Sequence, residues 1–158
     1  DSDIQSELRQ QVTQNSDGMD ISVISFDKSE SKINYAGAHN SIFYWSKDKQ
    51  ILEEIKATRR SIGGVYGDLD RKFQNVSLDM QEGDMIYLMS DGVVDQIGGM
   101  SDRKLMKKNL MAFLQQNAPL PCEKQYQHVE KFFHDWMHPA DEITHEQLDD
   151  MLLIGIKF

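Results

Sequence analysis

The residues best placed for chemistry are acids at the ends of two apolar runs. Asp91 and Gly92 follow the run at 85–89, and Asp149 and Asp150 precede the run that ends the sequence. A buried strand aims a carboxylate at its end, and a glycine after that carboxylate leaves room for a ligand. For Asp91, a simple turn in which the carboxylate caps its own backbone is an open alternative.

A cation becomes the natural partner if the acids of the two runs lie together. If the two strands are neighbours, Asp91 and Asp149 converge at one end of a sheet, where like charges repel unless a cation neutralises them. Adjacent residues of a strand point to opposite faces, so we expect either Asp149 or Asp150, but not both, to face this site. Hard divalent cations take oxygen ligands and would suit it.

Composition excludes several other classes of function. The net charge of −9 argues against nucleic acid as a partner, because phosphate binding needs clustered Lys and Arg. The single Cys122 excludes an internal disulfide and a thiolate zinc site. The apolar stretches are too short to span a bilayer, so we expect no direct membrane contact from this segment.

The pattern of apolar residues predicts an α+β fold of one partial domain. Short turns join most of the strands, which favours antiparallel pairing. Ser101 suits an N-cap, which predicts a helix from there to near Asn117. Its apolar face would carry Met106, Leu110, Phe113 and Leu114. In chain order we expect the end of a helix at 1–16, a strand-rich region at 17–99, a helical region at 100–148 and a final strand at 149–158.

Four short segments occur in a fixed order along the chain. They are "YAGAHN", "SIGG", "GDMIYLMSDGVVDQIGG" and "LDDMLLIGIKF". Together they closely resemble the metal-dependent protein phosphatase (PPM) family, in particular the bacterial branch of stage II sporulation protein E and the environmental sigma-factor phosphatases. The resemblance runs from about Asp17 to Phe158. It implies the PPM-type αββα four-layer fold, an antiparallel β-sandwich flanked by helices.

The resemblance also implies a reaction and the residues that serve it. PPM enzymes are protein serine/threonine phosphatases, hydrolases in which two Mn²⁺ or Mg²⁺ ions activate a water, so that no side-chain nucleophile is required. Asp91 and Asp149 match the family's metal-binding positions. We expect His39 to hold its turn by hydrogen bonds rather than to transfer a proton. The resemblance gives supporting roles around the ligands to Gly92, Asp150, Asp95 and His39.

One motif of the family has no counterpart in this sequence. It is an Asp-Gly near the start of the domain, and its carboxylate bridges both ions. We therefore expect an N-terminally truncated part of the domain that binds Mn²⁺ or Mg²⁺ weakly and is inactive alone. A sheet that lacks its first strands exposes an edge, through which we expect self-association.

The expected biological setting is bacterial signalling. By family analogy the substrate is a phosphoprotein such as an anti-sigma-factor antagonist, and the location is the cytoplasm, as the output domain of a larger sensor protein. A non-catalytic pseudophosphatase or protein-interaction module is the alternative. The presence of Asp91 and Asp149 favours the enzyme, whereas the missing first motif favours inactivity of this chain.

Overall fold

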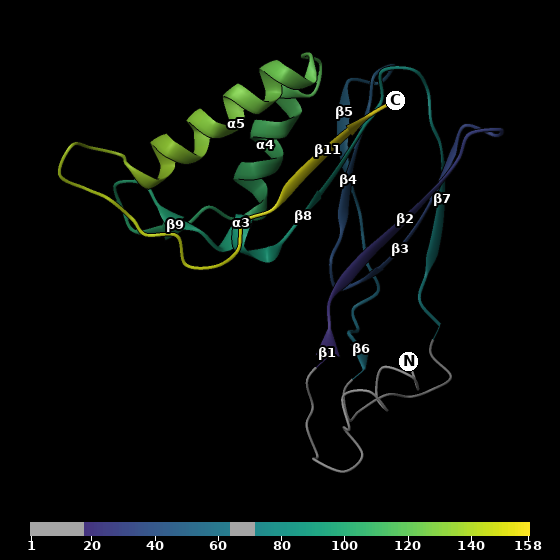
Figure 1. Ribbon diagram of the computed structural model, residues 1–158, viewed down its shortest axis with the longest axis horizontal. Coiled ribbons are helices and arrows are strands. Elements are labelled where there is room, and N and C mark those ends of the chain that lie inside the picture. The colour runs from purple at the N-terminus through teal and green to yellow at the C-terminus, as the bar shows by residue number, and fades with distance from the viewer. Residues whose placement is uncertain (1–17, 64–71) are drawn as a thin grey trace, which may run out of the picture. The chain divides into compact units, whose positions relative to one another are not determined.

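The computed structural model describes residues 18–63 and 72–158, and they divide into two compact units. The first unit is drawn from residues 1–42 and 55–80, and the second from residues 43–54 and 81–158 (Figure 1). The helix end that we predict at 1–16 lies outside the described residues. No helix among the described residues is long and apolar enough to cross a lipid bilayer.

The first unit contains a three-stranded antiparallel sheet. Two of its strands form a hairpin, and the side chain of Asp27 supports the turn between them by accepting a hydrogen bond from the Ser29 amide at 2.8 Å. The strand order is β2-β3-β7, and a small separate pair joins β1 to β6. The strands are β1 (Gly18–Met19), β2 (Ile21–Asp27), β3 (Lys32–Ala38), β6 (Ile62–Gly63) and β7 (Asn75–Asp79).

The second unit is built on a four-stranded sheet with the order β11-β8-β4-β5. Strand β8 pairs antiparallel with both of its neighbours, and four of its five residues are buried. This central position explains why the sequence of β8 is nearly all apolar, because a central strand is covered on both faces. The strands are β4 (Ile42–Ser46), β5 (Ile51–Ile55), β8 (Met85–Met89) and β11 (Leu153–Lys157).

Three helices and a small strand pair complete the second unit. The short helix α3 follows β8 directly, and α4 and α5 are joined by a Pro-containing break. Strands β9 and β10 pair antiparallel between α3 and α4. These elements are α3 (Asp91–Asp95), β9 (Ile97–Gly98), β10 (Arg103–Lys104), α4 (Lys107–Asn117) and α5 (Cys122–Met137).

The start that we predict for the first long helix is wrong. Residues after Ser101 form β10, and α4 begins only after Met106, whose φ of 66° cannot continue a helix. The Leu105 amide donates to the Gln96 carbonyl at 3.0 Å, which keeps this segment extended. Tertiary pairing therefore overrides the local capping signal, and Met106 is exposed instead of packed on the apolar face.

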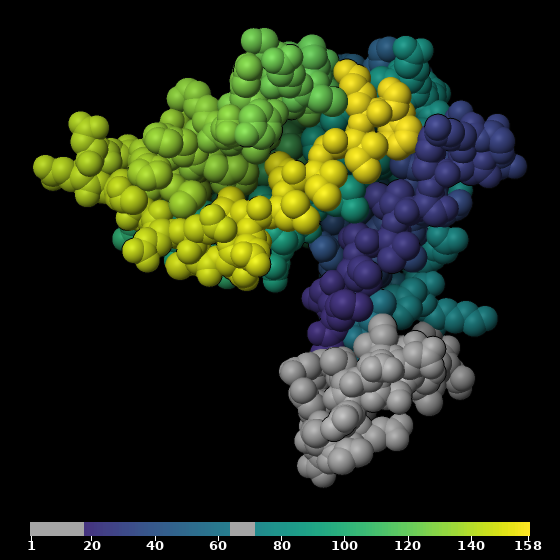
Figure 2. All heavy atoms as spheres, in the orientation of Figure 1, coloured from purple at the N-terminus to yellow at the C-terminus, as the bar shows by residue number. Residues whose placement is uncertain are grey.

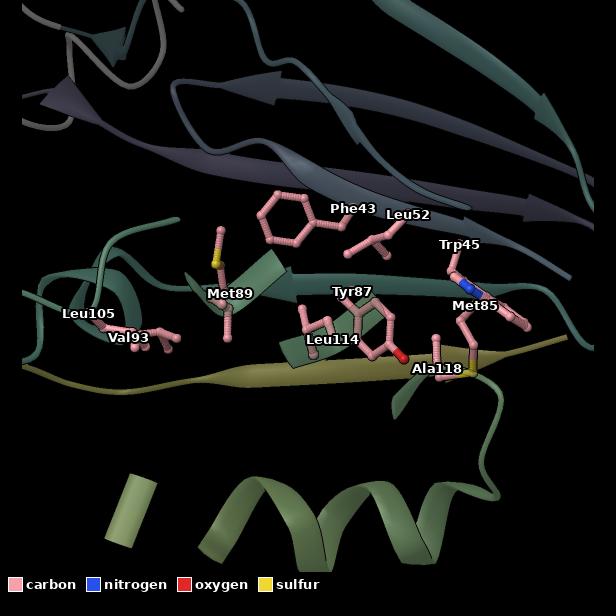
Figure 3. Close-up of a cluster of buried hydrophobic side chains, with 11 residues drawn as sticks. Phe43, Trp45, Leu52, Met85, Tyr87, Met89, Val93, Leu105, Leu114 and Ala118 are labelled. Atoms are coloured by element: carbon pink, nitrogen blue, oxygen red, sulfur yellow. The ribbon is translucent and has the colours of Figure 1, made fainter. Parts of the chain in front are cut away.

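The hydrophobic core of the second unit lies along β8 and β4. Helix α4 contributes Leu110 and Leu114, as its apolar spacing predicts. Helix α5 closes the cluster through Phe132, whose ring stacks on Phe113 with centroids 4.2 Å apart. Figure 3 shows the buried side chains gathered along β8. The cluster consists of Phe43, Trp45, Leu52, Met85, Tyr87, Met89, Val93, Leu105, Leu110, Leu114 and Ala118.

Candidate metal site

The pairing of β8 with β11 brings the two candidate ligands to the same end of one sheet. Leu153 lies opposite Met89, and the Ser90 amide donates to the Leu152 carbonyl at 2.9 Å. Asp91 follows β8 immediately and opens α3, whereas Asp149 lies in the segment that leads into β11. The structure thus confirms that these distant parts of the sequence meet, as Figure 1 shows for the two strands.

The final strand begins later than we predict. Strand β11 starts at Leu153, so Asp149 and Asp150 precede the strand and do not belong to it. The argument that adjacent strand residues face opposite sides therefore does not apply to them. Both residues are exposed.

Gly92 marks the closest approach between the two segments. A Cβ atom at this position would lie 2.5 Å from the Asp150 carbonyl oxygen and 3.2 Å from the Asp149 Cβ. Only a residue without a side chain allows this approach. The missing Cβ therefore lets the backbone of Asp149 and Asp150 pass close to the residue that follows Asp91.

Among the described residues, the carboxylates of Asp91 and Asp149 each accept a hydrogen bond only from the amide of the next residue. Oδ1 of Asp91 accepts the Gly92 amide at 2.9 Å, and Oδ1 of Asp149 accepts the Asp150 amide at 2.7 Å. Within the described ranges, no Lys, Arg or His side chain forms an ion pair with either acid. Acids held near one another without a protein cation favour a bound cation.

The donor set fits a hard divalent ion but supplies only part of its coordination sphere. Carboxylate oxygens are the ligands that Mg²⁺ and Ca²⁺ prefer, and Mg²⁺ usually keeps several waters. In the part of the chain that the structure describes, no group of three or more His, Cys, Asp or Glu residues could hold a metal ion. An ion held by Asp91 and Asp149 would therefore take the rest of its ligands from water.

Asp150 and Asp95, two of the expected supporting residues, have different partners. The backbone carbonyl of Asp150 accepts a hydrogen bond from the Ser90 hydroxyl at 2.7 Å. Asp95 ends α3 and pairs instead with Lys104, whose Nζ lies 2.9 Å from Asp95 Oδ2. Both partners of this pair are more than half exposed, so it stabilises α3 only weakly.

His39 belongs to the first unit of the chain. Its backbone lies in the left-handed region, with φ of 55°, and its amide donates to the Thr58 carbonyl at 2.9 Å. The imidazole is part of an exposed residue at the bend after β3. This backbone geometry agrees with the structural role that we expect for His39.

Sequence reasoning missed two residues that hold the acidic segment in place. Ser90 bonds to Asp150 and Leu152, and the buried side chain of Gln96 bonds to the backbone at Glu146 and Leu148. A hydroxyl residue directly before an Asp-Gly is a signal that could have indicated the first. For Gln96 the sequence carries no such signal, because only the fold shows that this amide is buried.

Comparisons with known proteins agree with this geometry. Residues 2–158 match the family model described as stage II sporulation protein E (SpoIIE). No curated protein matches the chain in sequence.

Solved structures of phosphatase domains share the fold. The SiaA-PP2C domain of Pseudomonas aeruginosa superposes with a TM-score of 0.79 and 22% identity, over 99% of this chain and 58% of that chain. The Mn-presoaked phosphatase domain of the cell fate determinant SpoIIE from Bacillus subtilis superposes with a TM-score of 0.56 and 14% identity, over 99% of this chain and 65% of that chain. The RsbU and RsbW domains of a Mycobacterium tuberculosis protein give a TM-score of 0.60 and 16% identity, over 96% of this chain and 39% of that chain.

The similarity covers almost all of this chain but only part of each relative. The chain spans 58% of the SiaA-PP2C domain and less than two thirds of the other two structures. At these identities the structures show the fold alone, which is the α+β antiparallel fold that the sequence predicts. Because the family model matches nearly every residue, the chain belongs to the SpoIIE family and has the fold of PP2C phosphatase domains.

Proposed function

We propose that this chain is part of a metal-dependent protein serine/threonine phosphatase domain, in which Asp91 and Asp149 hold Mn²⁺ or Mg²⁺. The observation that carries the proposal is the close approach of Asp149 to Gly92 at the end of the β8–β11 pair. Membership of the SpoIIE family and the PP2C fold support it. Two carboxylates without a protein cation supply the charge that such an ion needs.

In this reaction the residues of the chain bind and orient. A bound pair of ions would activate a water and neutralise charge on the phosphoryl oxygens during in-line displacement. Asp91 and Asp149 would hold one ion at the end of the sheet, and Gly92 lets the two segments that carry them approach closely. A water activated in this way makes a side-chain nucleophile unnecessary.

The proposed substrate is a phosphoprotein of bacterial signalling. Family membership supports a regulator such as an anti-sigma-factor antagonist, acted on in the cytoplasm by a larger sensor protein. One similar structure contains an RsbU domain and an RsbW domain of the same protein.

A non-catalytic interaction module is the second candidate function. The observation in its favour is that the described residues offer two carboxylates to an ion and no larger cluster. Two acids and water hold Mg²⁺ weakly, so we expect slow or undetectable turnover from the 158 residues alone.

A Mn²⁺ titration followed by NMR tests the metal site directly. Paramagnetic broadening is expected first at the amides of residues 90–92 and 149–152, even when binding is weak. Asp91→Asn and Asp149→Asn should each abolish this local broadening, because each removes half of the protein ligands. Asp48→Asn is the matched control, since Asp48 is an exposed acid in the turn after β4.

Two results would count against the proposal. Broadening elsewhere on the chain, or unchanged broadening in Asp91→Asn, would show that Mn²⁺ does not bind at Asp91 and Asp149. A phosphoserine peptide assay with Mn²⁺ then separates the two functions, since turnover that depends on Asp91 identifies an enzyme. Rapid turnover by the 158 residues would contradict the expectation that two carboxylates are insufficient.

A further inference from the structure

We propose that Ser90 and Gln96 are positioning residues, which hold the segment of Asp149 against the turn of Asp91. The inference rests on the proposed function, because it assigns the two residues to the same metal site. Neither residue is placed as a ligand. Each acts through hydrogen bonds to the backbone around Asp149.

The hydroxyl of Ser90, just after β8, makes two hydrogen bonds to the segment that leads into β11. It donates to the Asp150 carbonyl at 2.7 Å and accepts the Leu152 amide at 2.9 Å. The Ser90 amide also donates to the Leu152 carbonyl at 2.9 Å. Three hydrogen bonds therefore fix the backbone immediately after Asp149 to the residue immediately before Asp91.

The side chain of Gln96 holds the same segment on the other side of Asp149. Its Nε2 donates to the Glu146 carbonyl at 2.9 Å, and its Oε1 accepts the Leu148 amide at 3.4 Å. The residue is only 1% exposed. Its carbonyl accepts the Trp136 indole N–H at 3.1 Å, so the backbone of Gln96 is itself anchored to α5.

The segment that hydrogen-bonds to Ser90 and Gln96 is not held in place by burial. Every residue from Glu146 to Asp150 is exposed, and the segment has no regular strand or helix. An exposed loop with few buried contacts opens easily. A metal ligand on such a loop needs hydrogen bonds from a rigid neighbour to keep its geometry. Ser90 and Gln96 cap the two ends of the short helix α3, which begins with Asp91. One short element therefore positions Asp91 and both residues that bond to the segment of Asp149.

The experiment compares Ser90→Ala with Ser90→Thr in two measurements. Without metal, amide hydrogen exchange reports whether the segment is held. With Mn²⁺, broadening of the amides at 90–92 and 149–152 reports affinity. Ser90→Ala should speed exchange at Leu152 and weaken Mn²⁺ affinity by about tenfold, the scale of a lost partner that orients a metal ligand. Ser90→Thr keeps the hydroxyl and should restore both.

Two further variants keep the test independent of a general loss of stability. Gln96→Met replaces the buried amide with an apolar chain of similar size and should speed exchange at Leu148 and weaken Mn²⁺ affinity. Ser46→Ala is the matched control, because Ser46 ends β4 at the opposite end of the sheet and its hydroxyl accepts the Lys49 amide. It should change neither measurement.

The outcomes separate this inference from the proposed function. If Mn²⁺ binding depends on Asp91 and Asp149 but Ser90→Ala and Gln96→Met bind as well as the wild type, the positioning role is wrong and the metal site stands. If wild-type broadening does not depend on the two acids, the proposed function fails and the positioning role fails with it. Weakened binding by Ser46→Ala equal to that of Ser90→Ala would also overturn the inference.

Discussion

Two aspartates stand at the two ends of β8, and their surroundings give them different roles. Asp84 is buried and accepts hydrogen bonds from the Tyr44 hydroxyl at 2.9 Å, the Lys47 amide at 2.8 Å and the Gln81 amide at 3.0 Å. The hydrogen-bonding capacity of this carboxylate is satisfied by the protein, and the bonds stabilise the turns around it. Asp91 is exposed, and within ranges 18–63 and 72–158 its carboxylate accepts a hydrogen bond only from the Gly92 amide, which leaves it available to a ligand.

At the scale of single residues, Gly92 gives the sharpest prediction. Gly92→Ala would place a methyl group 2.5 Å from the Asp150 carbonyl oxygen, which is closer than real Cβ atoms approach. Because the obstacle is backbone, it cannot rotate away, and the segment of Asp149 must move. We expect the Mn²⁺-dependent broadening at residues 149–152 to be lost and the melting temperature to fall.

Gly155→Ala is the control for this substitution. It adds the same methyl group to β11, but the nearest atom, at 3.2 Å, belongs to the ring of Tyr87. This variant should keep the Mn²⁺ response. Wild-type broadening in Gly92→Ala would show that the close approach is not needed for the site.

At the scale of elements, the sequence predicted what periodicity and composition determine. The all-apolar run of β8 and the spacing of Leu110 and Leu114 in α4 were read correctly, because burial alone sets these patterns. The beginning of α4 and of β11 was wrong. Each depends on bonds to a distant residue, the Leu105 amide to Gln96 and the Leu152 amide to Ser90, and local sequence does not contain that information.

The same reasoning explains what was foreseen of the candidate site. Asp91 and Asp149 could be chosen because each lies beside an apolar run, and their meeting follows from the pairing of β8 with β11. The position of Ser90 before an Asp-Gly hints at a role in the turn, but the hydrogen-bond partners of Ser90 and Gln96 could not be foreseen, because a polar residue in the sequence does not show which backbone groups it faces. Metal binding by Asp91 and Asp149 stays a prediction.

The corrected start of α4 predicts a contrast between two residues that the apolar pattern treats alike. Leu114 is 1% exposed, whereas Met106 is 57% exposed. Leu114→Ala should lower the free energy of unfolding by about 2–5 kcal/mol, through lost burial and the cavity that remains. Met106→Ala should change it by less than about 0.5 kcal/mol, as surface changes usually do.

Urea unfolding followed by circular dichroism measures both variants, and Leu110→Ala serves as a second buried case because Leu110 shares the core cluster. Equal losses in Leu114→Ala and Met106→Ala would restore the original reading, in which the helix begins at Ser101 and Met106 packs inside.

At the scale of the whole molecule, β11 is the strand through which we expect chains to associate. It is one of the two outer strands of its sheet, with β5 at the other edge, and no described strand pairs with its other side. Ile154 and Ile156 are 41% and 37% exposed, and the yellow C-terminal run is visible on the surface in Figure 2. An open strand with exposed apolar side chains is a template for another strand.

The net charge of −9 opposes that association through repulsion between chains. Salt shortens the range of this repulsion, from about 30 Å at 0.01 M to about 8 Å at 0.15 M. We therefore expect light scattering to show self-association that grows with protein concentration and is stronger at 0.15 M salt than at 0.01 M. Ile154→Lys should suppress it, since a charge on an edge strand discourages pairing, whereas Ile51→Lys, an exposed isoleucine on β5, should not. A monomer at high concentration and moderate salt would show that β11 is protected in a way that its exposure does not reveal.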